Sequence, residues 1–379
     1  MKLSSRSAFD PAPNELARAL AERRARGERV IDLTESNPTR AGIPYDAETI
    51  VGALADRASM TYEPEPFGLP RARAVIASAY GVDAARVALT ASTSEAYGFL
   101  FKAFCDAGDE VLAPAPSYPL FAQLAAIEDV KLAPYRLRYD GAWHVDLASV
   151  RDAIGPRTRA ILVVSPNNPT GSCVTKAELA ALEALDLPVI CDEVFAEYMF
   201  RAPRDRVACA AMEATRGLVF SLGGLSKLAA LPQMKLAWMI AGGRDDLVQR
   251  ALERLAWIAD AYLSLATPVQ RALPTLLDAG AVSRDAIRTR LRRNLDAIDR
   301  VTRGTNATRL DVSGGWYATL RIARVRSEVE TCLRALDAGV YVHPGAFFDF
   351  EDEAYVVVSL LAREADVEEG VATIVSITR

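Results

Sequence analysis

The chain has 379 residues, of which 51% are hydrophobic, and a formal net charge of −5. This length suits about two domains with sizeable apolar cores, and the slightly negative charge argues against the basic surfaces of proteins that bind nucleic acids or anionic membranes. Five scattered cysteines without Cys-x-x-Cys spacing indicate reduced thiols, and two histidines are too few for a histidine-based metal cluster.

The N-terminal segment predicts neither a secretory signal nor a membrane anchor, because residues 1–6 are not followed by an apolar core. The sequence also contains no run of about 18 uncharged apolar residues. Reduced thiols and the absence of these signals fit a cytoplasmic location. We therefore expect no membrane partner, no nucleic-acid partner and no metal site.

Short apolar, β-prone runs alternate with helical stretches between residues 85 and 241. This alternation is typical of a mainly parallel sheet with crossover helices. The expected strands are 87–90, 111–113, 160–164, 189–192, 218–221 and 237–241. Ligands of such sheets bind beyond the carboxyl ends of the strands, so the turns after these runs are where we expect the chemistry.

The remaining sequence predicts a smaller α+β domain. The expected elements are long Arg-rich helices after residue 265, a turn at 313–315, a strand at 316–322, a helix near 327–338 and a strand at 355–360. Residues 1–40 are expected to pack on these elements. The predicted division is a large domain at 42–275 and a small domain formed by 1–41 and 276–379.

Two of the polar turns carry candidate ligand-binding groups. The turn at 90–95 joins a strand to a helix, where backbone N–H groups and the helix dipole can hold a phosphate. Ser92 and Glu95 also match the Ser-x-x-Glu capping box, which is a purely structural interpretation. In the turn at 165–171, Asn168 offers an amide donor to a cofactor hydroxyl, although an ordinary loop also explains the prolines and the glycine.

A third turn places Asp192 at the end of the apolar run 188–191. A buried carboxylate is costly unless it is paired, and a protonated ring nitrogen of a cofactor would be a suitable partner. A helix cap or an ion pair with an arginine is the alternative.

Lys227 lies in an apolar segment, 218–243, whose only other charged residue is Lys235. Burial would lower the pKa of the Lys227 amine and favour the neutral form that attacks an aldehyde. The alternative is a lysine whose stem covers apolar surface while its amine reaches water.

Taken together and in this order, these features resemble the class I/II aminotransferases, enzymes of fold type I that use pyridoxal phosphate (PLP). The matching motifs are Tyr62 with Gly68, residues 90–96, Pro116-Ser117-Tyr118, Asn168-Pro169-Thr170-Gly171, Asp192-Glu193-Val194 and Ser226-Lys227. The resemblance covers most of the chain. It implies an α/β fold with a mainly parallel, seven-stranded sheet in the large domain, PLP as the cofactor, and transfer of an amino group between an amino acid and a 2-oxo acid.

The resemblance also implies roles for individual residues. Lys227 would carry PLP as a Schiff base and move the proton, and Asp192 would pair with the ring nitrogen. The other implied cofactor contacts are Asn168 at the ring hydroxyl, Tyr118 stacked on the ring, and Ser92, Thr93, Lys235 and Ser221 at the phosphate. Tyr62 would reach the phosphate of the neighbouring subunit, which implies a homodimer with active sites shared across the interface.

Four positions depart from the family pattern. Phe195 stands where a tyrosine usually bonds the ring hydroxyl. Lys235 replaces an arginine and keeps the charge without the bidentate geometry, and Gly224 replaces a serine, for which Ser221 could compensate. Val357 stands where an arginine usually binds the substrate carboxylate, so either another residue binds that group or the substrate is not a plain α-amino acid.

The substrate side of the site is therefore expected to differ from the family. The candidate substrate residues are Asn37, Arg40, His343 and Arg363, and for His343 a loop-packing role is an equal alternative. Residues 257–268 contain no arginine for a second substrate carboxylate, which disfavours an acidic donor. Phe347, Phe348 and Tyr355 favour an apolar or aromatic one.

Two other outcomes remain open for a chain with this cofactor. A lyase that eliminates a β-substituent, such as a C–S bond, would use the same carbanion as a transaminase. A protein that binds PLP without turnover is a further alternative. A nicotinamide dehydrogenase is opposed because no Gly-x-Gly-x-x-Gly motif follows any expected strand.

Overall fold

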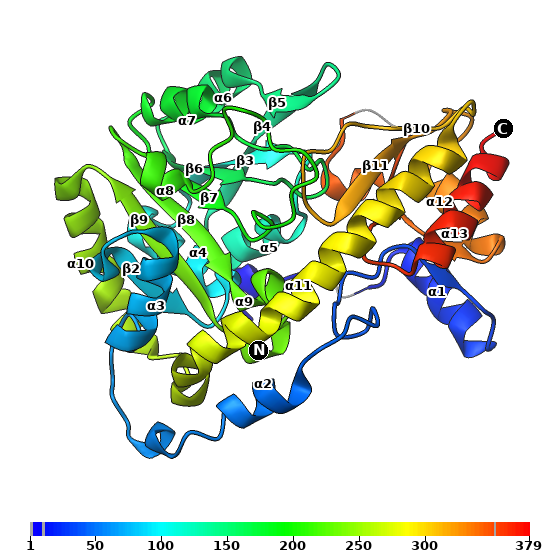
Figure 1. Cartoon of the computed structure of the whole chain (residues 1–379). Coiled ribbons are helices and arrows are strands. Elements are labelled where there is room, and N and C mark those ends of the chain that lie inside the picture. The colour runs from blue at the N-terminus through cyan, green and yellow to red at the C-terminus, as the bar shows by residue number, and fades with distance from the viewer. Residues whose placement is uncertain (1–2, 10–11, 352–353) are drawn as a thin grey trace.

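A computed structural model describes residues 3–9, 12–351 and 354–379. Met1 and Lys2, which begin the N-terminal segment considered above, lie outside the described residues. A large unit built on a broad sheet lies beside a smaller α+β unit, and one long helix, α11, runs from one to the other (Figure 1).

The large sheet has eight strands in the order β2-β9-β8-β7-β6-β3-β4-β5. Their bounds are β2 Val87–Thr90, β3 Glu110–Ala115, β4 Lys131–Tyr139, β5 Trp143–Val145, β6 Thr158–Val164, β7 Val189–Asp192, β8 Leu218–Gly224 and β9 Ala237–Gly243. All six strands located from the sequence are present. The expected number of seven is one too low, because the short β5 pairs antiparallel with β4. The pattern missed β4 because this partly exposed strand near the sheet margin mixes Lys, Arg and Pro with its apolar residues.

Strands β4, β3, β6, β7 and β8 run parallel, whereas β9 and β2 run antiparallel to their neighbours. The register pairs Val164 with Asp192 and Asp192 with Leu222. The carboxyl ends of β6, β7 and β8 therefore meet at one edge of the sheet. This edge brings together the turn at 165–171, Asp192 and the segment that carries Lys227.

Helices cover both faces of the large sheet. Successive side chains of a strand point to opposite faces, and both faces of this sheet carry apolar side chains that need to be buried. On one face, Val111, Leu162 and Phe220 pack with residues of α4 (Thr93–Phe104), α5 (Leu120–Ile127) and α10 (Asp245–Tyr262). On the other face, Ile161 and Val163 pack with α7 (Lys176–Glu183) and neighbouring elements. The remaining helices of the large unit are α2 Ala47–Ala53, α3 Pro70–Tyr80, α6 Leu147–Ala153, α8 Ala210–Glu213 and α9 Leu225–Leu228.

The smaller unit contains a four-stranded sheet in the order β10-β11-β14-β13. Its elements are β10 Thr308–Arg309, β11 Tyr317–Arg321, α12 Glu328–Asp337, β12 Val340–Tyr341, β13 His343–Pro344, β14 Tyr355–Ser359 and α13 Glu364–Ile377. The strands expected at 316–322 and 355–360 and the helix near 327–338 are confirmed to within one residue at each end.

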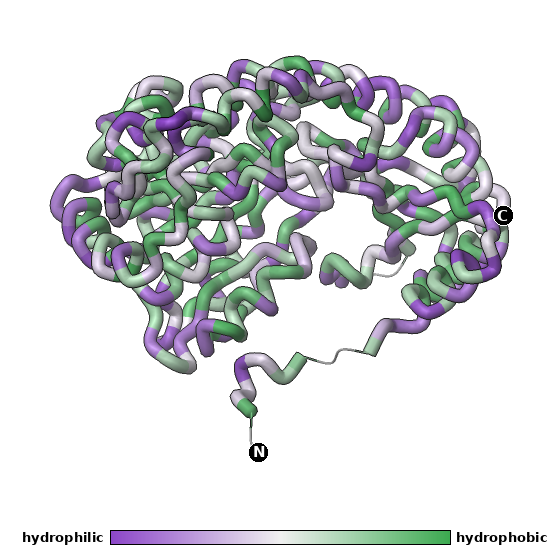
Figure 2. The backbone as a smooth tube through the Cα atoms, turned by 90° about the horizontal axis from the view of Figure 1, so that it is seen from below, coloured by the Kyte–Doolittle hydropathy of each residue, from purple (hydrophilic) through white to green (hydrophobic). Residues whose placement is uncertain are grey.

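From Glu15 onward the N-terminal part of the chain packs on this smaller unit, whereas Ser5–Ser7 contact α5 of the large unit, contrary to the expectation for residues 1–40. Leu16 and Leu20 of α1 (Glu15–Ala25) join its core, and β1 (Ile31–Asp32) pairs in parallel with β12. Helix α11 (Thr267–Thr302) contains the predicted domain boundary at 275/276, so the division itself stays a prediction. Figure 2 shows the two ends of the chain at separate places on the outline of the molecule. None of the helices in the described ranges is long and apolar enough to span a bilayer.

Candidate functional site

One pocket, with a cavity volume of about 320 Å³, lies beyond the carboxyl ends of β6, β7 and β8. Seven of the residues singled out from the sequence line it: Ser92, Thr93, Tyr118, Asn168, Asp192, Lys227 and Lys235. Six do not: Asn37, Arg40, Tyr62, Ser221, His343 and Arg363. The structure thus brings together seven of the nine expected cofactor residues from separate segments of the chain, but none of the expected substrate residues.

Lys227 lies on the four-residue helix α9, directly after β8. Its Nζ atom is 4.7 Å from the ring centroid of Trp316 and 5.7 Å from that of Phe195. Burial lowers the pKa of the lysine to about 8, and nearby Asp192 partly opposes this shift. The amine therefore lies against aromatic rings rather than extending into water, with a substantial neutral fraction near pH 8.

Asp192 is buried at the end of β7. The Tyr97 hydroxyl donates to its Oδ2 at 2.8 Å, and the backbone N–H of Val194 donates to its Oδ1 at 3.1 Å. Burial raises the pKa of Asp192, while Tyr97, Val194 and Lys227 oppose the rise. The bond from Val194 matches the capping alternative, but the side chain also faces the pocket, where an added positive charge would favour its ionised form.

The two asparagines of the turn at 165–171 have different partners. Asn167 donates to Pro116 O at 3.0 Å and to Thr170 Oγ1 at 2.8 Å, and it accepts a 2.7 Å bond from Ser117 Oγ. Asn168 is also buried, but its Oδ1 has no hydrogen-bond partner among the described residues. Asn167 therefore stabilises the turn, while Asn168 retains an unused polar atom next to the pocket.

Gly171 closes this turn with φ of +66°, and a Cβ atom there would lie 2.2 Å from Val312 Cγ2 and 2.5 Å from Gly314 O. We expect Gly171→Ala to lower the free energy of unfolding by about 2–4 kcal/mol, because backbone strain and overlap add. Urea unfolding measures this change. Gly304→Ala is the matched control, since Gly304 has φ of +71° and no atom within 4 Å of the position that a Cβ would take. Equal losses in both variants would contradict the steric part of the argument.

The turn at 90–95 begins helix α4, with Ser92 as the N-cap. Ser92 Oγ accepts the N–H of Glu95 at 3.1 Å. Glu95 Oε2 accepts the N–H of Ala91 at 2.7 Å rather than that of Ser92, so only half of the expected capping box forms. The start of a twelve-residue helix and the exposed Lys235 both line the pocket, and such a pair can bind an anion.

The pocket residues missed from the sequence include three with hydroxyl groups: Ser36, Tyr97 and Tyr317. Tyr97 follows Thr93 by four residues on α4, so helical spacing could have placed both on one face. Ser36 directly precedes the candidate Asn37. Tyr317 begins β11 of the smaller unit, and no local pattern predicts that this strand reaches the pocket.

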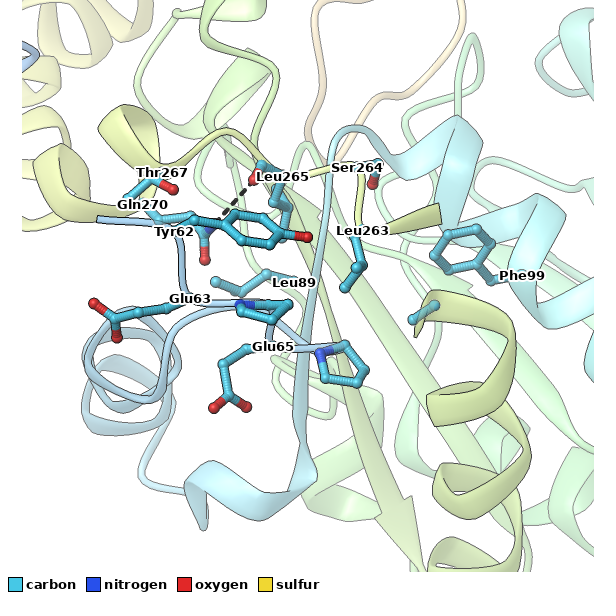
Figure 3. A pocket seen from close by; sticks show the side chains of 13 residues that line it. Tyr62, Glu63, Glu65, Leu89, Phe99, Leu263, Ser264, Leu265, Thr267 and Gln270 are labelled. Carbon is cyan, nitrogen blue, oxygen red and sulfur yellow. Dashed lines mark hydrogen bonds between the residues drawn. The ribbon is translucent and has the colours of Figure 1, made fainter. Parts of the chain in front are cut away.

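Two of the expected phosphate contacts lie elsewhere. Ser221 Oγ accepts a bond from Ala211 N at 2.9 Å and lies beside Glu193 rather than in the pocket. The residue therefore cannot compensate for Gly224 in this geometry. Tyr62 is 73% exposed and lines a separate pocket with Leu265 and Gln270 (Figure 3). Its proposed contact with a neighbouring subunit stays a prediction.

The expected substrate residues are also dispersed. Val357 is only 2% exposed on β14, between Thr319 of β11 and His343 of β13. The His343 ring lies 5.6 Å from Tyr341, and burial lowers the pKa of His343 while Asp32 opposes the shift. This geometry supports the loop-packing alternative for His343.

Three further candidate substrate residues lie outside the pocket as well. The same holds for the aromatic residues from which an aromatic amino donor was predicted. Asn37 Oδ1 accepts the N–H of Thr39 at 3.0 Å, Arg40 is exposed, and Arg363 lies in another pocket with Arg290. Phe347, Phe348 and Tyr355 are absent from the lining. The aromatic side chains that do line the pocket are Tyr97, Tyr118, Phe121, Phe195 and Tyr317.

Glu193, next to Asp192, is a buried carboxyl group outside this pocket. Its Oε1 accepts the N–H of Ala210 at 2.6 Å. Burial raises its pKa to about 7, and hydrogen bonds from Ala210, Ser221 and two cysteines oppose the rise. Because the folded-state pKa lies above the ordinary 4.5, this group's contribution to stability is fully present below pH 4.5 and is lost as pH rises through about 7.

The free energy of unfolding of the wild type is expected to fall between pH 5 and pH 8.5, in part because Glu193 ionises. In Glu193→Gln this decrease is expected to be smaller by roughly 2–3 kcal/mol. Denaturant unfolding at both pH values measures the difference. Glu48→Gln, at an exposed position, is the control. A Glu193→Gln variant with an unchanged pH dependence would show that the carboxyl group does not titrate in this range.

Comparisons with known proteins place most of the chain in one family. The family model described as aminotransferase class I and II matches residues 28–374. The chain is 27% identical over 262 residues to glutamate-pyruvate aminotransferase AlaA of Escherichia coli (strain K12), an alignment that covers 66% of this chain and 64% of that protein. It is 28% identical over 262 residues to tyrosine aminotransferase of Mus musculus, covering 65% of this chain and 57% of that protein. These matches thus span less than two thirds of the relatives' lengths.

Among solved structures, alanine aminotransferase from Pyrococcus furiosus superposes with a TM-score of 0.88 at 24% identity, covering 100% of this chain and 99% of that one. Aspartate aminotransferase of Thermus thermophilus with maleate superposes with a TM-score of 0.82 at 22% identity, covering 100% of both chains. The fold is therefore that of these enzymes.

Proposed function

The chain belongs to the aminotransferase class I and II family, and from this premise we propose that it uses PLP to transfer an amino group from an amino acid to a 2-oxo acid. The observation that carries the proposal is the convergence of Lys227, Asp192 and Asn168 on one pocket from three adjacent strand ends. Each of these residues has the chemistry that one part of PLP requires.

The groups that line the pocket fit this cofactor. The buried carboxylate of Asp192 suits a protonated ring nitrogen, and the amide of Asn168, whose oxygen has no partner among the described residues, would hold the ring hydroxyl. The exposed ring of Tyr118 offers a stacking surface. The start of α4, with Thr93, and the ammonium of Lys235 are suited to a phosphate.

PLP, when bound, supplies an electron-withdrawing ring that stabilises negative charge on the substrate carbon that bears the amino group. Asp192 contributes by holding a positive charge at the ring nitrogen, in an orientation set by Tyr97 and Val194. Lys227, with its lowered pKa, is suited to bind an aldehyde as the neutral amine and then to accept and return the substrate proton. Trp316 and Phe195 cover the amine on its apolar side and exclude water there.

We also propose that the working unit is a homodimer and that the protein acts in the cytoplasm. The exposed side chains of Met60 (89%) and Tyr62 (73%), two residues apart in one segment, support a contact between two copies. An apolar or aromatic amino donor is favoured, because the charged residues among the described pocket lining are Asp192, Lys227 and Lys235. Sedimentation analysis of the PLP-loaded protein tests the dimer.

A lyase is the second candidate, because Val357 cannot bind a carboxylate and no arginine lines the described pocket. Adding amino acids one at a time to the PLP-loaded protein separates the two functions. A transaminase converts the cofactor to its amine form and releases the matching 2-oxo acid. Release of pyruvate and ammonia without that conversion would instead favour the lyase. An unchanged cofactor together with no released product, for every amino acid, would contradict both.

A further inference from the structure

Phe195 places a ring without a hydroxyl beside the pocket. It is buried on the turn after β7, with its centroid 5.5 Å from that of Trp316 and 6.4 Å from that of Tyr317. The turn therefore offers no side-chain hydrogen-bond donor at this position. A cofactor oxygen bound next to Asn168 would need a donor, or a means of orienting Asn168, from another part of the chain.

Tyr317 brings a hydroxyl to the same place from a different element. It is the first residue of β11, opposite Ser359 of β14, and it lines the pocket together with Asn168 and Ser36. Burial raises the pKa of Tyr317, and the nearby side chains of Ser36 and Asn168 oppose that rise. One phenol thus contacts the N-terminal segment, the turn at 165–171 and, by edge-to-face packing, the ring of Phe195.

Asn168 has an acceptor available for this phenol. Its Oδ1 is buried without a hydrogen-bond partner among the described residues, and Asn168 lines the same pocket as Tyr317. Because a hydroxyl donates as well as accepts, the Tyr317 hydroxyl is a suitable donor to this oxygen.

Resting on the proposed function, we propose that Tyr317 is a positioning residue for the cofactor and takes over the role of the hydroxyl that Phe195 lacks. When the cofactor ring oxygen binds, the Tyr317 hydroxyl donates to Asn168 Oδ1 and so holds Asn168 Nδ2 toward that oxygen. Every buried polar atom of Asn168 then has a partner. Cofactor binding consequently involves the smaller unit through β11, in addition to the strand ends of the large sheet.

The test uses the PLP-loaded protein and Tyr317→Phe, with the pH titration of the visible band of lysine-bound PLP as the readout. A donor bond to the ring oxygen withdraws negative charge that otherwise stabilises the proton on the neighbouring nitrogen of Lys227. Tyr317→Phe is therefore expected to raise the titration midpoint by roughly one pH unit and the Kd of PLP about tenfold. Tyr341→Phe, which removes a hydroxyl of the smaller unit away from the pocket, is expected to change neither.

A double-mutant cycle with Asn168→Ala separates positioning from general packing. If Tyr317 acts through Asn168, Tyr317→Phe produces no further shift of the midpoint in the Asn168→Ala background. An unchanged midpoint in Tyr317→Phe, or the same shift in both backgrounds, would overturn this inference alone. A wild-type protein that shows no visible band with PLP would overturn the proposed function and this inference together.

Discussion

Replacing Lys227 by alanine is expected to lower the rate of amino-group transfer by about 10³-fold or more, because a positioned acid–base group contributes roughly 10²–10⁴-fold and the covalent attachment of the cofactor is lost as well. The amine of Lys227 lies against Trp316 and Phe195 with its pKa lowered to about 8. Single-turnover rates at saturating PLP measure the loss. The visible band of lysine-bound cofactor is expected to disappear in the same variant.

Lys131→Ala is the matched control for this prediction. Lys131 is exposed at the start of β4 and does not line the pocket, so the variant is expected to keep the wild-type rate and the visible band. A Lys227→Ala protein that transfers amino groups at the wild-type rate would show that another amine carries the chemistry. The exposed Lys235 is the other lysine in the described lining, and it would then be tested next.

Replacing Asp192 by asparagine is expected to lower kcat by about 10²–10³-fold, since removing one preorganised electrostatic partner of a developing charge has effects of this size. Asparagine keeps the shape of the side chain and can still accept the hydroxyl of Tyr97, so the change is mainly the loss of negative charge beside the ring nitrogen. Steady-state kinetics at saturating PLP separate this effect from weaker cofactor binding.

Asp140→Asn, on the exposed turn between β4 and β5, is the control and is expected to leave kcat unchanged. Thermal unfolding of both variants checks that they fold. A folded Asp192→Asn protein with the kcat of the wild type would contradict the role of Asp192 as the partner of the ring nitrogen. The buried carboxylate would then serve only to accept the bonds from Tyr97 and Val194.

The sequence by itself determined the central sheet and the cofactor side of the site. Six strands could be located because a short, continuous apolar run is typical of a strand that is buried on both faces of a sheet. Strand β4 could not be recognised because it contains charged residues among its apolar ones. Lys227, Asp192 and Asn168 could be predicted together for a related reason. Each lies at or just after the carboxyl end of a parallel strand, and the carboxyl ends of neighbouring parallel strands meet at one edge of the sheet.

Only the tertiary structure decided which distant residues complete the pocket. Tyr317 and Ser36 lie in segments whose own sequence is compatible with many positions, and they reach Asn168 because the smaller sheet and the N-terminal segment dock beside the large sheet. His343 and Ser221 had suitable chemistry, but His343 packs against Tyr341 in the smaller unit and Ser221 bonds to Ala211 within the large unit, so neither lines the pocket. Local patterns report periodicity and turn chemistry, whereas long-range packing sets which side chains share a cavity.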